Sequence, residues 1–161
     1  LTAPSLYLAF GNKDQLFQEA VEYYVQKYGA PVLAPLQATG SAREAIGRML
    51  QNSAALVSSK NNPQGCMVSF AAVNCADHLS PAAALLQHFR GTTFAALQKR
   101  LALACDQGEL PPTTDTARLA RFYQAAMGGI QLLSLDGAAP EELAAVAQDA
   151  MRAWPAASPA A

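Results

Sequence analysis

The sequence is poor in charge, in aromatic residues and in cysteine, and these shortages exclude several classes of protein. Only 14% of its 161 residues are charged and the net charge is −1, which argues against a strongly basic nucleic-acid binder within these residues. The three cysteines, Cys66, Cys75 and Cys105, are odd in number and widely spaced. They match neither a disulfide framework nor a zinc site, and they indicate a reducing, cytoplasmic setting.

Long hydrophobic runs and targeting signals are also missing. The longest charge-free stretch near the C-terminal end, residues 122–135, is too short to span a membrane and contains two glutamines. No signal peptide opens the sequence. We therefore expect a soluble cytoplasmic protein without a membrane partner. Hydrophobic residues are abundant, at 52%, which is ample material for the core of one domain.

The motifs of common enzymes are absent. The sequence contains no GxSxG, HExxH, P-loop or dinucleotide fingerprint. His78 and His88 lie ten residues apart across a predicted helix start, so no helical face aligns them. The adjacent Glu141 and Glu142 are explained by the positive end of a helix. The sequence therefore predicts no catalytic residues, no cofactor and no metal site.

Local signals predict helices along nearly the whole chain. Asn12 followed by Gln15, and Ser41 followed by Glu44, have the spacing of capping boxes that open helices. The predicted helices are, in order, residues 13–28 with a break or kink at Gly29 and Pro31, 41–59, a short buried helix at 66–76, 80–107 after the Ser80-Pro81 cap, 115–135 and 140–154. No segment alternates as a strand does, so the predicted fold class is all-α.

The predicted helix 115–135 is apolar around most of its circumference, and such a helix is buried on more than one side. The final predicted helix, 140–154, has one apolar face that is rich in small residues. Either they are core helices of a monomer, or the pair is half of a four-helix interface of a homodimer, and periodicity alone does not separate the two. The candidate interface residues are Leu119, Phe122, Ala126, Gly129, Ile130, Leu133, Leu143, Val146, Ala150 and Trp154.

The start of the chain carries a pattern in which residue type and spacing are both specific. In "TAPSLYLAFGNKDQLFQEAV", residues 2–21, a short apolar segment stops at a glycine and a new helix begins at once. This stretch resembles the end of the DNA-binding domain of TetR/AcrR transcriptional regulators. The resemblance is carried by Thr2, Ser5, Leu6, Tyr7, Phe10, Asn12, Lys13, Leu16 and Phe17. More loosely, "GCMVSFAA", "GEL" and "GGIQLLSLDGAAPEELAAVAQDAM" look like the regulatory domains of one branch of that family.

The resemblance implies a domain organisation. Residues 1–28 would be the remnant of a three-helix helix-turn-helix domain, without its first two helices, together with the linking helix. Residues 29–154 would form a multi-helix regulatory domain for ligand binding and dimerisation, and residues 155–161 a frayed tail.

The same resemblance implies a double-stranded DNA operator as a partner. Small side chains at the start of a recognition helix suit close approach to base edges, while Tyr7 and Lys13 suit phosphates. A dimer that reads a palindrome is the natural arrangement. The candidate DNA-binding residues are Thr2, Ala3, Pro4, Ser5, Tyr7, Leu8 and Lys13.

The expected function is that of a homodimeric repressor that releases DNA when a small effector binds. Aromatic residues and methionines predict a pocket for an apolar or aromatic effector. The candidate lining residues are Tyr23, Met49, Cys66, Met67, Phe70, Phe89 and Phe94, each of which is alternatively an ordinary core residue. Cys66 is also a candidate redox or electrophile sensor, because "PQGC" places it in the first turn of a helix. The alternative function is a helical small-molecule carrier or protein-interaction domain without a DNA role.

Overall fold

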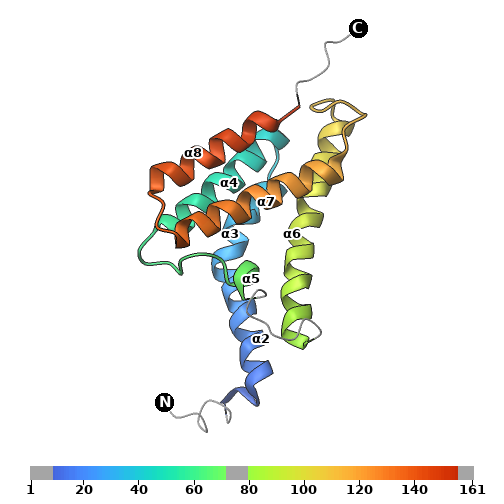
Figure 1. Ribbon diagram of the computed structural model, residues 1–161. Helices are drawn as coiled ribbons and strands as arrows, with labels where there is room; N and C mark the ends of the chain where they lie inside the picture. The colour runs from blue at the N-terminus through green and yellow to red at the C-terminus, as the bar shows by residue number, and fades with distance from the viewer. Residues whose placement is uncertain (1–8, 72–79, 156–161) are drawn as a thin grey trace.

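The computed structural model describes residues 9–71 and 80–155, and in these ranges the chain forms helices and no strand, which confirms the all-α class. The main helices are α2 (Lys13–Tyr24), α3 (Ala30–Leu33), α4 (Ala42–Ser58), α5 (Met67–Phe70), α6 (Pro81–Asp106), α7 (Thr116–Leu135) and α8 (Pro140–Ala150). Helices α4, α7 and α8 pack against one another, and α6 packs along α7 (Figure 1). Helix α2 extends away from this bundle and contacts α5 and α6. No helix in the described ranges is long and apolar enough to cross a membrane.

Helix α2 begins at the predicted capping box. The Asn12 side chain accepts a hydrogen bond from the Gln15 backbone N–H at 2.9 Å, and the Gln15 side chain accepts one from the Asn12 backbone N–H at 3.1 Å. These two bonds satisfy N–H groups that the first turn of a helix leaves without partners.

The predicted break at Gly29 and Pro31 takes the form of a change of helix type. Helix α2 passes directly into a π-helical segment, Val25–Gly29, then into α3 and a 3-10 turn, Ala34–Gln37. A proline inside an α-helix removes one backbone hydrogen bond and crowds the carbonyl four residues earlier. The wider π turn lies where Pro31 creates that conflict, so the helix widens and continues.

The core lies among α4, α6, α7 and α8. Its largest fully buried side chains include Ile46, Met49, Leu50, Leu97, Leu101, Leu110, Tyr123, Ile130 and Leu143. Three residues assigned to a dimer interface from their helical spacing belong to this core. Ile130 and Leu143 are at most 1% exposed and Ala150 is 8% exposed, because these positions face neighbouring helices of the same protomer.

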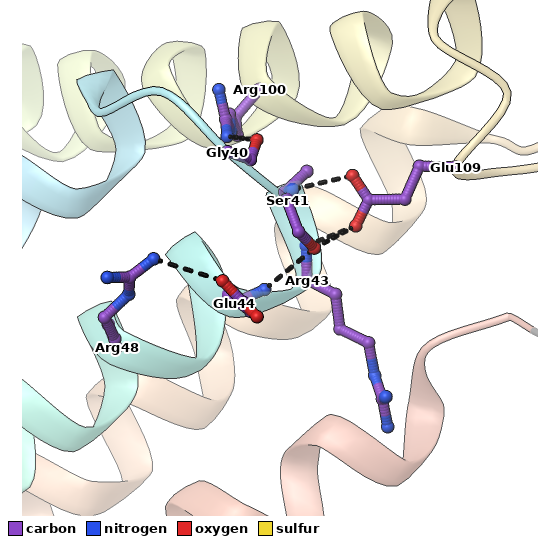
Figure 2. Close-up of polar contacts among 8 residues, drawn as sticks. Gly40, Ser41, Arg43, Glu44, Arg48, Arg100 and Glu109 are labelled. Carbon is purple, nitrogen blue, oxygen red and sulfur yellow. Dashed lines mark hydrogen bonds and ion pairs between the residues drawn. The ribbon is translucent and has the colours of Figure 1, made fainter.

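The start of α4 differs from the predicted capping box. Ser41 Oγ accepts a hydrogen bond from the Glu44 backbone N–H at 3.3 Å, but the Glu44 carboxylate pairs with Arg48 at 3.4 Å and leaves the cap. Glu109, from the loop between α6 and α7, takes its place (Figure 2). Its carboxylate accepts bonds from Ser41 Oγ at 2.5 Å, from the Ala42 N–H at 2.7 Å and from the Arg43 N–H at 2.8 Å.

The segment Gly108-Glu109-Leu110 ends one helix and caps another. Gly108 has φ +74°, a conformation that glycine adopts at little cost, and the Glu109 N–H bonds the Ala104 carbonyl at 2.8 Å, as in a Schellman motif. Leu110 is 1% exposed and joins the core. Beside them Arg100 donates a hydrogen bond to the Gly40 carbonyl (Figure 2). The "GEL" triplet therefore fixes the junction of α4 and α6.

The helix predicted for residues 66–76 is only partly described. One turn, Met67–Phe70, is helical, and its side chains are half-buried rather than buried. Residues 72–79, which include Cys75 and His78, lie outside the described ranges, as does the tail from 156 to 161. The Ser80 cap is confirmed, since Ser80 Oγ accepts a hydrogen bond from the Ala83 N–H at 3.2 Å.

Candidate ligand-binding cavity

A cavity of about 470 Å³ lies beside the junction of α2 and the π-helical segment. It is bounded by α2, the π-helical segment, α3, α4, α5 and α6, and α7 supplies a further wall. The described lining residues are Tyr24, Val25, Tyr28, Gly29, Val32, Leu33, Leu56, Cys66, Val68, Ser69, Gln87, Phe89, Arg90, Gly91, Thr92, Thr93, Arg121, Gln124, Met127 and Gln131. A volume of this size suits a small organic molecule.

One wall of the cavity joins α2 to α5. Burial raises the pKa of Tyr24, and the neighbouring Cys66 thiol raises that pKa further. The Tyr28 ring lies 5.3 Å from the Tyr24 ring, so two aromatic side chains one helical turn apart form a continuous surface. A ligand against this wall would contact the end of α2 and the π-helical segment that follows it.

The opposite wall comes from α6 and α7 and is polar. Gln124 Nε2 donates to the Arg90 carbonyl at 2.8 Å, and Arg121 Nη1 donates to Gln124 Oε1 at 3.4 Å. The Arg121 guanidinium also stacks over the Phe94 ring, 3.8 Å from its centroid. The cavity thus combines an aromatic wall with a cationic one.

Only two of the predicted lining residues, Cys66 and Phe89, line the cavity. Tyr23 is 60% exposed and its hydroxyl accepts a hydrogen bond from Lys27 at 3.0 Å, so it lies on the surface. Met49 is fully buried in the core, where it packs between helices. Met67, Phe70 and Phe94 are half-buried without being lining residues, and Phe94 supports Arg121.

The sequence reasoning missed the residues that give the cavity its polarity. Arg90 is the one formally charged residue between positions 81 and 98, and Arg121 lies on a helix that is otherwise largely apolar. The sequence feature that could have identified both arginines as cavity residues is a charged side chain within an otherwise apolar helix. Tyr24 was missed because adjacent residues differ by about 100° around a helix, and the pattern did not fix which tyrosine faces inward.

The DNA-facing candidates lie almost entirely outside the described ranges. Thr2, Ala3, Pro4, Ser5, Tyr7 and Leu8 fall in residues 1–8. Lys13 is exposed in the first turn of α2, at the opposite end of that helix from the cavity. Within residues 9–71 and 80–155, no group of three or more His, Cys, Asp or Glu side chains is placed to hold a metal ion.

Helix α7 presents an apolar strip to the surface. Phe122 is 43% exposed, Leu132 is 49% exposed and Leu133 is 38% exposed. Gly129 lies between them along the helix, and a Cβ added there would meet no atom within 4 Å. Leu119, Ala126, Val146 and Trp154 are partly buried against the core. Large exposed apolar side chains in a row are typical of an interaction surface.

Comparison with known proteins identifies the family to which this fold belongs. Residues 42–151 match the family described as "Tetracyclin repressor-like, C-terminal domain". The chain is 31% identical over 158 residues to the HTH-type transcriptional repressor ComR of Escherichia coli, an alignment that covers 95% of this chain and 73% of ComR. It therefore belongs to the TetR family of transcriptional regulators.

Two further relatives agree with this assignment. The uncharacterized HTH-type transcriptional regulator YezE of Bacillus subtilis is 31% identical over 119 residues, which cover 73% of this chain and 61% of YezE. The TetR family regulator CifR, solved as a cysteine mutant with a 26-bp double-strand operator DNA, is 33% identical, with a TM-score of 0.89 over 96% of this chain and 81% of CifR.

Proposed function

We propose that this protein is a homodimeric, effector-responsive repressor that releases a palindromic operator when a small molecule with an apolar or aromatic body fills the cavity. The single observation that carries the proposal is that the π-helical segment and the end of α2 form one wall of the cavity. The helix that lines the ligand space is thus the helix that follows the family's DNA-binding residues. The carrier alternative loses support, because the relatives are transcriptional regulators.

The coupling follows from the continuity of the helix. Tyr24, Val25 and Tyr28 touch the cavity, and no loop separates them from Lys13 at the start of α2. A ligand that binds better to one orientation of this segment shifts the population toward that orientation. Because π turns break the regular α-helical hydrogen-bond pattern, the segment is the natural place for α2 to change direction.

DNA binding gives the first test. In the full-length protein, Lys13→Ala and Tyr7→Phe should weaken operator binding and random-DNA binding by similar factors, because phosphate contacts carry little sequence information. Replacing Thr2 or Ser5 should instead change the preferred sequence. Fluorescence anisotropy at two salt concentrations measures both effects. If the folded wild-type dimer bound the DNA upstream of its own gene no more tightly than random DNA, the proposed function as a sequence-specific regulator would be wrong.

Cys66 gives a second test, because its thiol lines the cavity. The helix-end argument from the sequence does not hold, since α5 has only four residues and its dipole is correspondingly small. We propose that alkylation of Cys66 mimics the effector by filling the cavity beside Tyr24. N-ethylmaleimide should then release the operator from the wild type and from Cys105→Ser, but not from Cys66→Ser. Equal release from wild type and Cys66→Ser, or release from neither, would remove Cys66 as a switch.

A further inference from the structure

The cavity contains two arginine side chains and no acidic one among its described lining residues. Arg90 comes from α6 and Arg121 from α7. Neither guanidinium lies within 4.0 Å of a carboxylate in the part of the chain that the structure describes. Two cations that share a partly enclosed space, with no carboxylate of the described residues beside them, raise its potential and favour the entry of an anion.

Neutral groups hold both guanidinium groups in place. Arg90 Nη1 donates to the Val68 carbonyl at 3.0 Å, and the Phe94 ring supports Arg121 from below its plane. Gln124 bonds the Arg90 carbonyl with one side-chain atom and Arg121 with the other. Since arginine has five N–H donors, each side chain keeps donors that no described residue accepts. Stacked, oriented guanidinium groups recognise carboxylates and related oxyanions well.

A third donor lies deeper. Gln131 is only 6% exposed and lines the cavity. Its Oε1 accepts a hydrogen bond from Ser69 Oγ at 3.1 Å, which fixes the orientation of the amide. The N–H groups of its Nε2 are donors that an oxyanion of a ligand in the cavity would accept.

We propose that the ligand of this cavity is an organic anion, with an aromatic or apolar body against Tyr24, Tyr28 and Phe89 and one carboxylate or sulfonate group paired with Arg90 and Arg121. This proposal depends on the proposed function in one respect only, which is that it takes the cavity to be the effector site. It adds an anionic group to the apolar or aromatic effector that the sequence predicts, since the predicted lining residues did not include the two arginines.

A matched pair of fluorescent probes tests the charge. The probes are 8-anilino-1-naphthalenesulfonate and N-phenyl-1-naphthylamine, which share their ring system and differ in the sulfonate. The wild-type protein should bind the sulfonate at least about tenfold more tightly than the neutral probe, the scale of one charge-assisted hydrogen bond. Arg121→Gln and Arg90→Gln should each remove most of this preference by weakening sulfonate binding alone, and Arg121→Lys should restore part of it.

Two variants control for the site. Arg118→Gln removes an exposed arginine one turn away on α7 and should leave both affinities unchanged. Thr93→Trp places an indole in the cavity and should abolish both signals, which locates the probes there. Equal affinities for the two probes, equal losses in the arginine variants, binding that survives Thr93→Trp, or no binding of either probe would overturn the proposal. The assay contains no DNA, so it tests the cavity independently of the proposed function. If the cavity prefers the sulfonate probe but the protein never releases its operator, the proposed regulatory function is wrong and the anion-binding proposal still holds.

Discussion

Replacing Gly129 with aspartate is expected to convert a dimer into a folded monomer. Within the protomer a Cβ at this position meets no atom within 4 Å, so the side chain fits without strain. In a dimer that pairs the exposed strip of α7 with its copy, two unpaired carboxylates would be buried, at a cost of at least about 3 kcal/mol. The dimer dissociation constant should then rise by at least about 100-fold. Light scattering over a dilution series measures this change.

Two matched variants separate assembly from folding. Gly129→Ala adds only a methyl group and should keep the dimer unless the partner helix touches the glycine backbone, while raising helix stability by roughly 0.5–1 kcal/mol. Ile130→Asp should unfold the protomer, because Ile130 is fully buried within it. Circular dichroism distinguishes the two outcomes. A monomeric wild type, or a Gly129→Asp dimer of unchanged affinity, would contradict the interface on α7.

Removing the Glu109 carboxylate should cause the largest loss of stability of any single polar change in the described loops. Glu109→Ala leaves the Ala42 and Arg43 N–H groups and the Ser41 hydroxyl without their acceptor. A helix cap and hydrogen bonds to a charged group are together worth about 2–3 kcal/mol. Urea unfolding at fixed protomer concentration measures the change. Glu44→Ala is the control, since its ion pair with Arg48 is exposed and should contribute less than about 0.5 kcal/mol.

The pH dependence of stability provides an independent check on Glu109. Burial alone would raise the pKa of its carboxyl, but the hydrogen bonds from Ser41, Arg43 and Ala42 and the charge of Arg100 together lower it below the ordinary value of 4.5. A lowered folded-state pKa adds stability above pH 4.5, and that stability is lost as the pH falls through the folded value. Glu109→Gln should therefore show a weaker loss below about pH 5 than the wild type. Identical pH profiles would exclude this role.

What could be predicted from the sequence was mostly local. The caps at Asn12 and Ser80 act within three residues, so the sequence places them correctly. The true cap of α4 could not be found in this way, because Glu109 lies 66–68 residues from the groups that it binds. Helical spacing likewise identified Ile130 as apolar and inward-facing, but did not say whether its own protomer or a partner buries it.

The cavity shows the same division. The cavity lies among helices that carry the predicted lining residues, but which side chains reach it depends on the rotation of each helix, such as α2, about its axis. Counting at 3.6 residues per turn therefore could not establish that Tyr24 faces the cavity while Tyr23 faces solvent.

A bend at the π-helical segment would be amplified along the length of α2. The helix has 12 residues and is thus about 18 Å long. A swing of about 10° at the cavity would displace its far end by about 3 Å, close to the spacing of one base pair along B-DNA. In a two-fold dimer the α2 helices of both protomers would move. The distance between the two DNA-binding regions would then change by up to about twice that amount. A small angular change at one turn of helix is then enough to make the spacing of the two DNA-binding regions differ from the spacing of the operator half-sites.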